Sequence, residues 1–147
     1  MTHCQTFPYL YNTSQLDVAL AEKDAAAATY TQLNATAVEV VVPAMPNATY
    51  ARSLRASFEA GVRISQLIAV GWRVMALGYA GDRGGGAYNV TALRGAIALY
   101  DQLYADYHAF PATYPPGIAP GLMNASYWQH PGSGPGLAAS VDKYRHV

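Results

Sequence analysis

The sequence predicts an all-α fold: an irregular three-helix bundle with a Pro/Gly-rich C-terminal tail and a short final helix. Three observations lead to this prediction. Apolar residues recur at steps of three and four over long stretches, which is the period of an amphipathic helix. Segments rich in proline and glycine separate these stretches. With 147 residues, 52% of them hydrophobic and 12% charged, the chain can bury a core of its own.

We divide the chain into three parts. Residues 1–13 form an irregular, aromatic N-terminal segment, and residues 14–110 form the bundle. Residues 111–147 form the tail, whose short final helix is expected to pack back on the bundle.

The first helix is expected to begin with Ser14 as its N-cap and Asp17 three residues later, a short variant of the capping box. Its inner face carries Leu16, Leu20, Ala27 and Tyr30. The β-branched run TAVEVVV (residues 36–42) suits either a strand or the last helical turns before Pro43. We favour a helix to about Val38.

The connector PAMPNAT (residues 43–49) leads to the second helix, with Asn47 or Thr49 as its cap. Its apolar stripe is expected to be Tyr50, Leu54, Phe58, Gly61, Ser65, Ile68, Trp72 and Met75. Beyond Arg63 the helix is apolar on nearly every side, which predicts burial by neighbours all round. The glycine-rich segment 78–89 is expected to end it.

The third helix is expected to start near Asn89 or Thr91 and to stop at Pro111. Its stripe is tyrosine-rich: Leu93, Ala96, Ile97, Tyr100, Leu103, Tyr104, Tyr107 and Phe110. The final segment LAASVDKYRHV predicts a short helix that turns Leu137, Val141 and Tyr144 inward.

Every asparagine in the chain is followed two positions later by serine or threonine, which makes each one an N-glycosylation acceptor motif. The five are Asn12, Asn34, Asn47, Asn89 and Asn124. Serine and threonine make up about 11% of the chain, so five chance matches have a probability on the order of 10⁻⁵.

Helix capping is the competing explanation, because Asn, Ser and Thr all cap helices. Capping does not explain a hydroxyl residue two positions after every asparagine, so we favour an extracellular or secretory-pathway location. The N-terminus MTHCQTFPYL has no signal-peptide pattern. We therefore expect the chain to be part of a longer precursor.

Two groups of residues are possible ligand or interaction sites. Asp82 and Arg83 lie in the glycine-rich segment that leads to a helix N-terminus, although it lacks the residues of a phosphate-binding P-loop. Tyr127, Trp128 and His130 could form a sugar-stacking loop or could pin the tail to the bundle.

No catalytic residue, cofactor or metal site is predicted. Asp101 and Asp106 do not converge on one face, the histidines lack ligand spacing, and Cys4 is the only cysteine. Nine basic and nine acidic residues cancel, which gives no basic surface for nucleic acid. No apolar stretch is long enough for a membrane span. The low charge predicts an apolar face that a partner or sugars cover.

Four stretches carry a resemblance to a known class of protein: ALAEKDAAAA, WRVMALGYAGD, ALYDQLYADYHAFPATYP and GLAASVDKYR. Over Leu16 to Arg145 they resemble the C-terminal helical regions of large secreted glycoside-hydrolase-like proteins. The resemblance implies that the catalytic carboxylates sit on a separate (β/α)₈ barrel, which the helical region braces.

The chain is therefore expected to be a non-catalytic structural or accessory module of a larger secreted, carbohydrate-active protein. Its partner would be a missing domain of the same precursor or another protein. One alternative is a free-standing interaction or glycan-binding module. Another is a small helical enzyme with its site near the glycine-rich loop.

Overall fold

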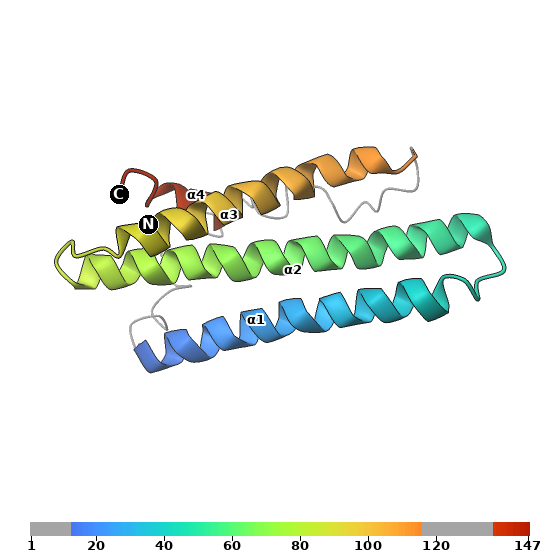
Figure 1. The fold of residues 1–147 in the computed structure, drawn as a ribbon, viewed down its shortest axis with the longest axis horizontal. Helices are drawn as coiled ribbons and strands as arrows, with labels where there is room; N and C mark the ends of the chain where they lie inside the picture. The colour runs from blue at the N-terminus through green and yellow to red at the C-terminus, as the bar shows by residue number, and fades with distance from the viewer. Residues whose placement is uncertain (1–12, 116–136) are drawn as a thin grey trace, which may run out of the picture.

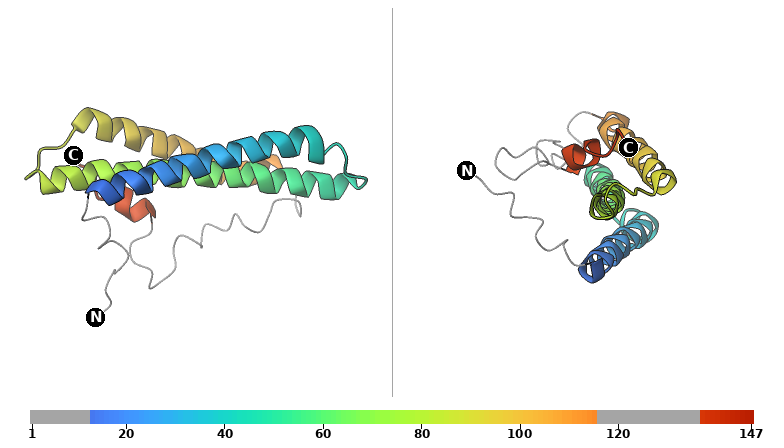
Figure 2. Two further views of the ribbon diagram at one scale, coloured as in Figure 1. Left: turned by 90° about the horizontal axis from the view of Figure 1, so that it is seen from below. Right: turned by 90° about the vertical axis from the view of Figure 1, so that its left-hand side faces the viewer.

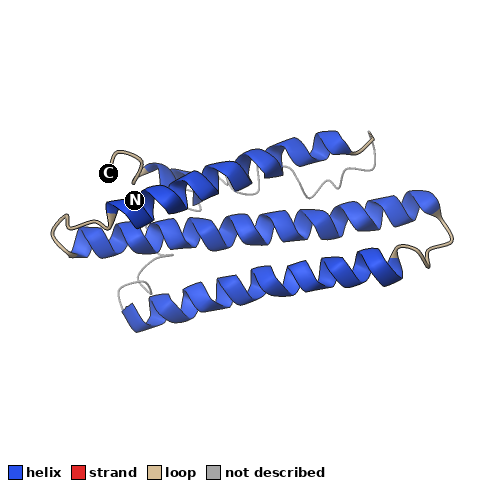
Figure 3. Cartoon of the chain, in the orientation of Figure 1, coloured by secondary structure: helices blue, strands red, loops and turns tan. Residues whose placement is uncertain are grey.

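The computed structural model describes residues 13–115 and 137–147 and confirms an all-α helical bundle over them (Figures 1 and 3). The elements in chain order are α1 (Thr13–Thr36), the π-helical turn η2 (Ala37–Val41), α2 (Ala48–Arg83), α3 (Val90–Ala109), the 3₁₀ turn η3 (Phe110–Thr113) and α4 (Leu137–Asp142).

Helix α2 is the centre of the molecule. Helix α2 runs antiparallel to α1, and α3 runs antiparallel to α2 (Figure 1). Helices α1, α3 and α4 each pack on α2 (Figures 1 and 2). Helices α1 and α3 lie on different sides of α2 and hardly touch each other (Figure 2). The bundle is therefore open, and among the described helices α1 packs chiefly on α2.

Helix α1 differs from expectation at both ends. It begins at Thr13, so Ser14 is its second residue and not its cap. At the other end the β-branched run stays helical, as the wider π turn η2, and it stops before Pro43. Lys23 lies over the ring of Trp72 with its Nζ 5.5 Å from the ring centroid. Arg73 Nη2 donates to both carboxylate oxygens of Asp24, at 2.8 and 3.1 Å, and this ion pair ties α1 to α2.

The expected stripe on α2 is only partly right in its first half, where Leu54, Phe58 and Gly61 are half-buried. Tyr50 is 59% exposed, while the buried positions of that half are the small residues Ala51, Ala56 and Ala60. The reason is that α2 has neighbours on more than one side, and small residues let the backbones approach closely. The second half is buried on several sides, as expected, from Ser65 to Gly81.

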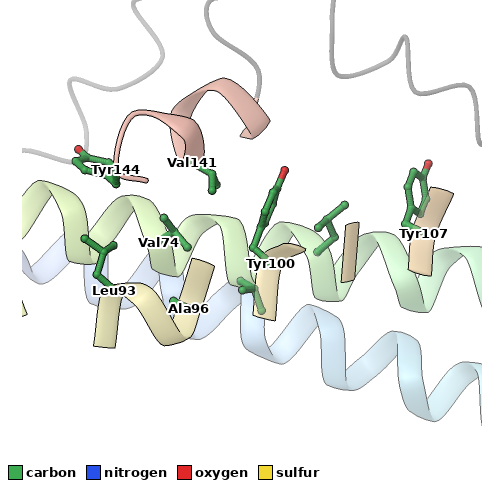
Figure 4. Close-up of a cluster of buried hydrophobic side chains, with 9 residues drawn as sticks. Val74, Leu93, Ala96, Tyr100, Tyr107, Val141 and Tyr144 are labelled. Atoms are coloured by element: carbon green, nitrogen blue, oxygen red, sulfur yellow. The ribbon is translucent and has the colours of Figure 1, made fainter. Parts of the chain in front are cut away.

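Helix α4 lies on a row of small residues along α2. A Cβ built on Gly71 would fall 2.7 Å from three atoms of Leu137, and one built on Gly78 would overlap the ring of Tyr144. Val74 lies between these glycines and is fully buried, as is Val141 of α4 (Figure 4). The prediction that this segment turns inward is confirmed, and the glycines explain how it comes so close.

The core continues from α4 to the inner face of α3 (Figure 4). Its buried members on α3 are Leu93, Ala96, Tyr100 and Tyr107, spaced at helical intervals. Tyr104 of the expected stripe stays 39% exposed and stacks instead between Tyr100 and His108, with ring centroids 6.0 and 4.2 Å away.

Candidate functional site

The richest gathering of polar side chains lies where α2 ends and the C-terminal segment returns to it. We call it the Asp82 cluster: Asp82, Tyr88, Lys143 and Tyr144. Tyr88 donates its hydroxyl to Asp82 Oδ1 at 2.5 Å. Lys143 Nζ and Tyr144 Oη both donate to Asp82 Oδ2, at 2.7 and 3.0 Å. Lys143 Nζ also donates to Tyr144 Oη at 3.2 Å.

The local backbone explains how Tyr88 reaches Asp82. Helix α2 continues to Arg83, so Asp82 and Arg83 lie in its last turn, which corrects the expectation that they belong to the loop. The loop itself turns on Gly85 and Gly86, which have φ of 66° and 93°, values that favour glycine. Gly81 has no side chain to block the Tyr88 ring, which passes directly against its Cα.

The pKa directions show what the Asp82 cluster can do chemically. Hydrogen bonds from Lys143 and Tyr88 lower the pKa of Asp82, and the bond to Asp82 raises the pKa of Lys143. The same carboxylate raises the pKa of Tyr88, while burial raises that of Tyr144.

Each group is thus held in the protonation state it already has at neutral pH. A tyrosine or lysine that acts as a base or nucleophile needs its pKa lowered. The arrangement therefore suits an anchor for the C-terminal segment.

A second set of bonds fastens the same segment to α3. Arg145 donates to both oxygens of Asp101, at 2.6 and 2.8 Å, and to Asp142 at 2.6 Å. Arg94 of α3 donates to the main-chain oxygen of Val147 at 3.2 Å. The sequence predicted only that Asp101 does not form a catalytic pair with Asp106. The bonds from Arg145 to Asp101 were not predicted.

A third cluster lies around Glu59, in the first half of α2. Arg55, one helical turn before Glu59, bonds to its carboxylate at 2.8 Å, and Arg63 approaches Glu59 at 4.0 Å. Tyr114 donates to the other carboxylate oxygen at 2.8 Å, which sequence reasoning missed. The Arg63 guanidinium lies 4.1 Å from the centroid of the Phe110 ring.

The pKa values around Glu59 follow the same logic as those of the Asp82 cluster. Burial raises the pKa of Glu59, but the bonds from Arg55 and Tyr114 outweigh it and leave the pKa lowered. Burial and the bond to Glu59 raise the pKa of Tyr114 to about 12. This cluster ties the end of α3 to α2 and also holds its members in their ordinary charge states.

Three of the five acceptor asparagines lie in the described part of the chain. Asn47 is the N-cap of α2 and accepts from Tyr50 N at 3.0 Å. Asn89 is the N-cap of α3 and accepts from Ala92 N at 3.1 Å. Both asparagines are exposed. Asn34 lies inside α1, half-buried, and its Oδ1 is buried without a hydrogen-bond partner.

Of the remaining predicted site residues, Arg83 is exposed on the last turn of α2. Asn12, Asn124, Tyr127, Trp128 and His130 lie outside the described residues. Over residues 13–115 and 137–147, no three His, Cys, Asp or Glu side chains gather where they could hold a metal ion.

No protein-family model, curated protein or solved structure matches this chain. None of the helices described here is both long and apolar enough to span a membrane.

Proposed function

We propose that this domain is a non-catalytic structural module that packs the free side of α1 against another domain of the same protein or against a partner protein. The observation that carries the proposal is a set of large apolar side chains left in solvent. We call it the apolar edge: Tyr30, Leu33, Val40, Val41 and Tyr50, each between 37% and 62% exposed.

These residues gather at one end of the molecule, where α1 and η2 lead into α2 (Figure 1). Leu33 lies in the last turn of α1, and Val40 lies in the π turn η2 that continues it. Glu39 is the only charged residue between Asp24 and Arg52. Exposed apolar residues with so little charge around them are typical of a surface that another protein covers.

The titratable clusters also favour a structural role. Asp82, Glu59 and Asp101 each bind a cation or tyrosine that comes from a distant part of the chain. Their side chains join α2, α3 and the C-terminal segment, which gives the module the rigidity that a brace needs. The sequence resemblance to helical regions that brace a (β/α)₈ barrel supports the same role in a secreted, carbohydrate-active protein.

Sedimentation velocity of the full chain tests the proposal. Without its partner, the chain should self-associate through the apolar edge as its concentration rises. Leu33→Lys with Val40→Lys should restore a monomer. The matched control is Leu99→Lys, which changes an apolar residue of α3 that is 41% exposed and should leave the association unchanged.

Two results would argue against this function. One is a wild-type chain that stays monomeric at high concentration and melts in one cooperative step. The other is an association that Leu99→Lys weakens as much as Leu33→Lys with Val40→Lys does, because the association would then not depend on the apolar edge.

A further inference from the structure

We propose that Asn47 and Asn89 are the N-glycan acceptors of the described part of this chain, and that Asn34 is not one. The inference rests on the lumenal location that belongs to the proposed function. It separates three acceptor motifs of the same N-x-T pattern by their structural settings.

The two capping asparagines leave the reactive atom free. Asn47 uses its Oδ1 to accept from Tyr50 N, and Asn89 uses its Oδ1 to accept from Ala92 N. Both residues are exposed, so Nδ2, the atom that takes the sugar, is accessible. An amide that is substituted on its nitrogen keeps its carbonyl oxygen, so the cap survives the modification.

From this chain the reaction needs that nitrogen and the hydroxyl residue two positions later, which completes the acceptor motif. Asn Nδ2 forms a bond to the anomeric carbon of an oligosaccharide carried on a lipid diphosphate. The carbon–oxygen bond to the diphosphate breaks, Nδ2 loses one proton, and the lipid diphosphate leaves. The lumen supplies both the donor and the transferase.

The threonines of these two motifs have no part in the fold. Thr49 and Thr91 are exposed on the first turns of α2 and α3, and neither side chain makes a hydrogen bond within the described ranges. Capping accounts for Asn47 and Asn89 but gives no reason for a hydroxyl two positions later. The acceptor motif accounts for both residues.

Asn34 is in a different setting. It lies on α1 at helical spacing from Ala27 and Ala37, on the side that packs against α2. One atom of its amide is buried without a partner. Exchanging the oxygen and the nitrogen would bury Nδ2 instead, so either orientation keeps the amide against the interface. A glycan there would force α1 away from α2.

The two acceptors lie differently relative to the proposed packing surface. Asn47 precedes α2 and Asn89 follows it, so the two acceptors lie at opposite ends of the longest helix (Figure 1). A glycan on Asn47 borders the apolar edge at Tyr50, whereas a glycan on Asn89 lies at the far end of α2 from it.

The test is to secrete the full chain from a eukaryotic host behind a cleavable signal sequence. Asn12→Gln and Asn124→Gln remove the other two motifs and give the parent protein. Thr36→Ala, Thr49→Ala and Thr91→Ala then each remove one motif while keeping its asparagine. The readout is the number of endoglycosidase-sensitive steps on a gel of the secreted fraction.

We expect two steps for the parent, one step each for Thr49→Ala and Thr91→Ala, and two steps for Thr36→Ala. Fewer than two steps in the parent, or a step lost with Thr36→Ala, overturns the inference. Asn47→Asp, which keeps an N-cap oxygen but removes the acceptor, should behave like Thr49→Ala. The association test uses unglycosylated protein, so the two proposals can fail separately.

Discussion

Gly78→Ala tests how the C-terminal segment is seated on α2. A Cβ at position 78 would lie 2.5 Å from Tyr144 Cδ2 and closer still to two other ring atoms. Carbon atoms that are not bonded pack at about 3.5–4.0 Å, so the ring has to move by about 1 Å or more. Moving the ring also weakens the hydrogen bond from Tyr144 to Asp82.

Two terms of opposite sign set the size of the effect. Overpacking of a tight contact costs about 1–3 kcal/mol, and the weakened hydrogen bond adds about 1 kcal/mol. Replacing glycine by alanine inside a helix returns about 1 kcal/mol. We expect Gly78→Ala to lower the free energy of unfolding by about 2 kcal/mol.

The matched control is Gly95→Ala on α3, where an added Cβ meets nothing within 4 Å. This variant keeps only the helix-propensity term and should gain about 1 kcal/mol. Urea unfolding followed by circular dichroism gives both values, and hydrogen exchange of residues 137–147 reports whether the segment lifts. In a Tyr144→Ala background the cost of Gly78→Ala should vanish. A Gly78→Ala protein as stable as Gly95→Ala, with an unchanged segment, would refute the reasoning.

Substitutions at two further positions probe the polar side chains. Because Lys143 and Tyr88 lower the pKa of Asp82 below 3.8, its contribution to stability is present above the unfolded-state pKa and is lost as pH falls through the lower folded-state value. Urea unfolding should therefore show that Asp82→Asn is less stable than wild type by about 1 kcal/mol at neutral pH. This difference in the free energy of unfolding should disappear below about pH 4. A difference that stays constant with pH would contradict the role given to the Asp82 carboxylate. Asn34→Leu removes a buried, unpartnered oxygen and should raise the free energy of unfolding by about 1 kcal/mol. Asn34→Asp should lower it, because a carboxylate costs more to bury than an amide. A destabilised Asn34→Leu protein would mean that the amide has a partner.

Helix positions could be predicted from local signals. Asn47 and Asn89 begin α2 and α3 as caps, and Pro43 comes shortly after the end of η2, because each of these residues acts on its own turn of backbone. The inward side of the final segment was also predictable, since Val141 and Tyr144 are three residues apart.

The packing of α2 was not predictable in the same way. A stripe of large residues is expected when a helix has one neighbour, but α2 has three. Close approach then favours small residues, and the sequence does not mark which glycine receives a side chain. Gly78 and Gly95 look alike in the sequence, yet only Gly78 has a ring against it.

The polar clusters depend on contacts between distant parts of the chain. Arg55 is one helical turn from Glu59, but Tyr114 is 55 residues further on. Asp82 was singled out for its loop, whereas Lys143 and Tyr144 reach it from the C-terminal segment. Only the packing of the C-terminal segment and of the end of α3 against α2 reveals these partners.

Hydrogen exchange at low and high protein concentration tests the central claim most directly, because it maps the surface that the module uses. The account predicts that amides of residues 30–50 exchange more slowly as the concentration rises, while those of α3 keep their rates. Slowing confined to α3, or no change in residues 30–50 when the chain associates, would contradict it.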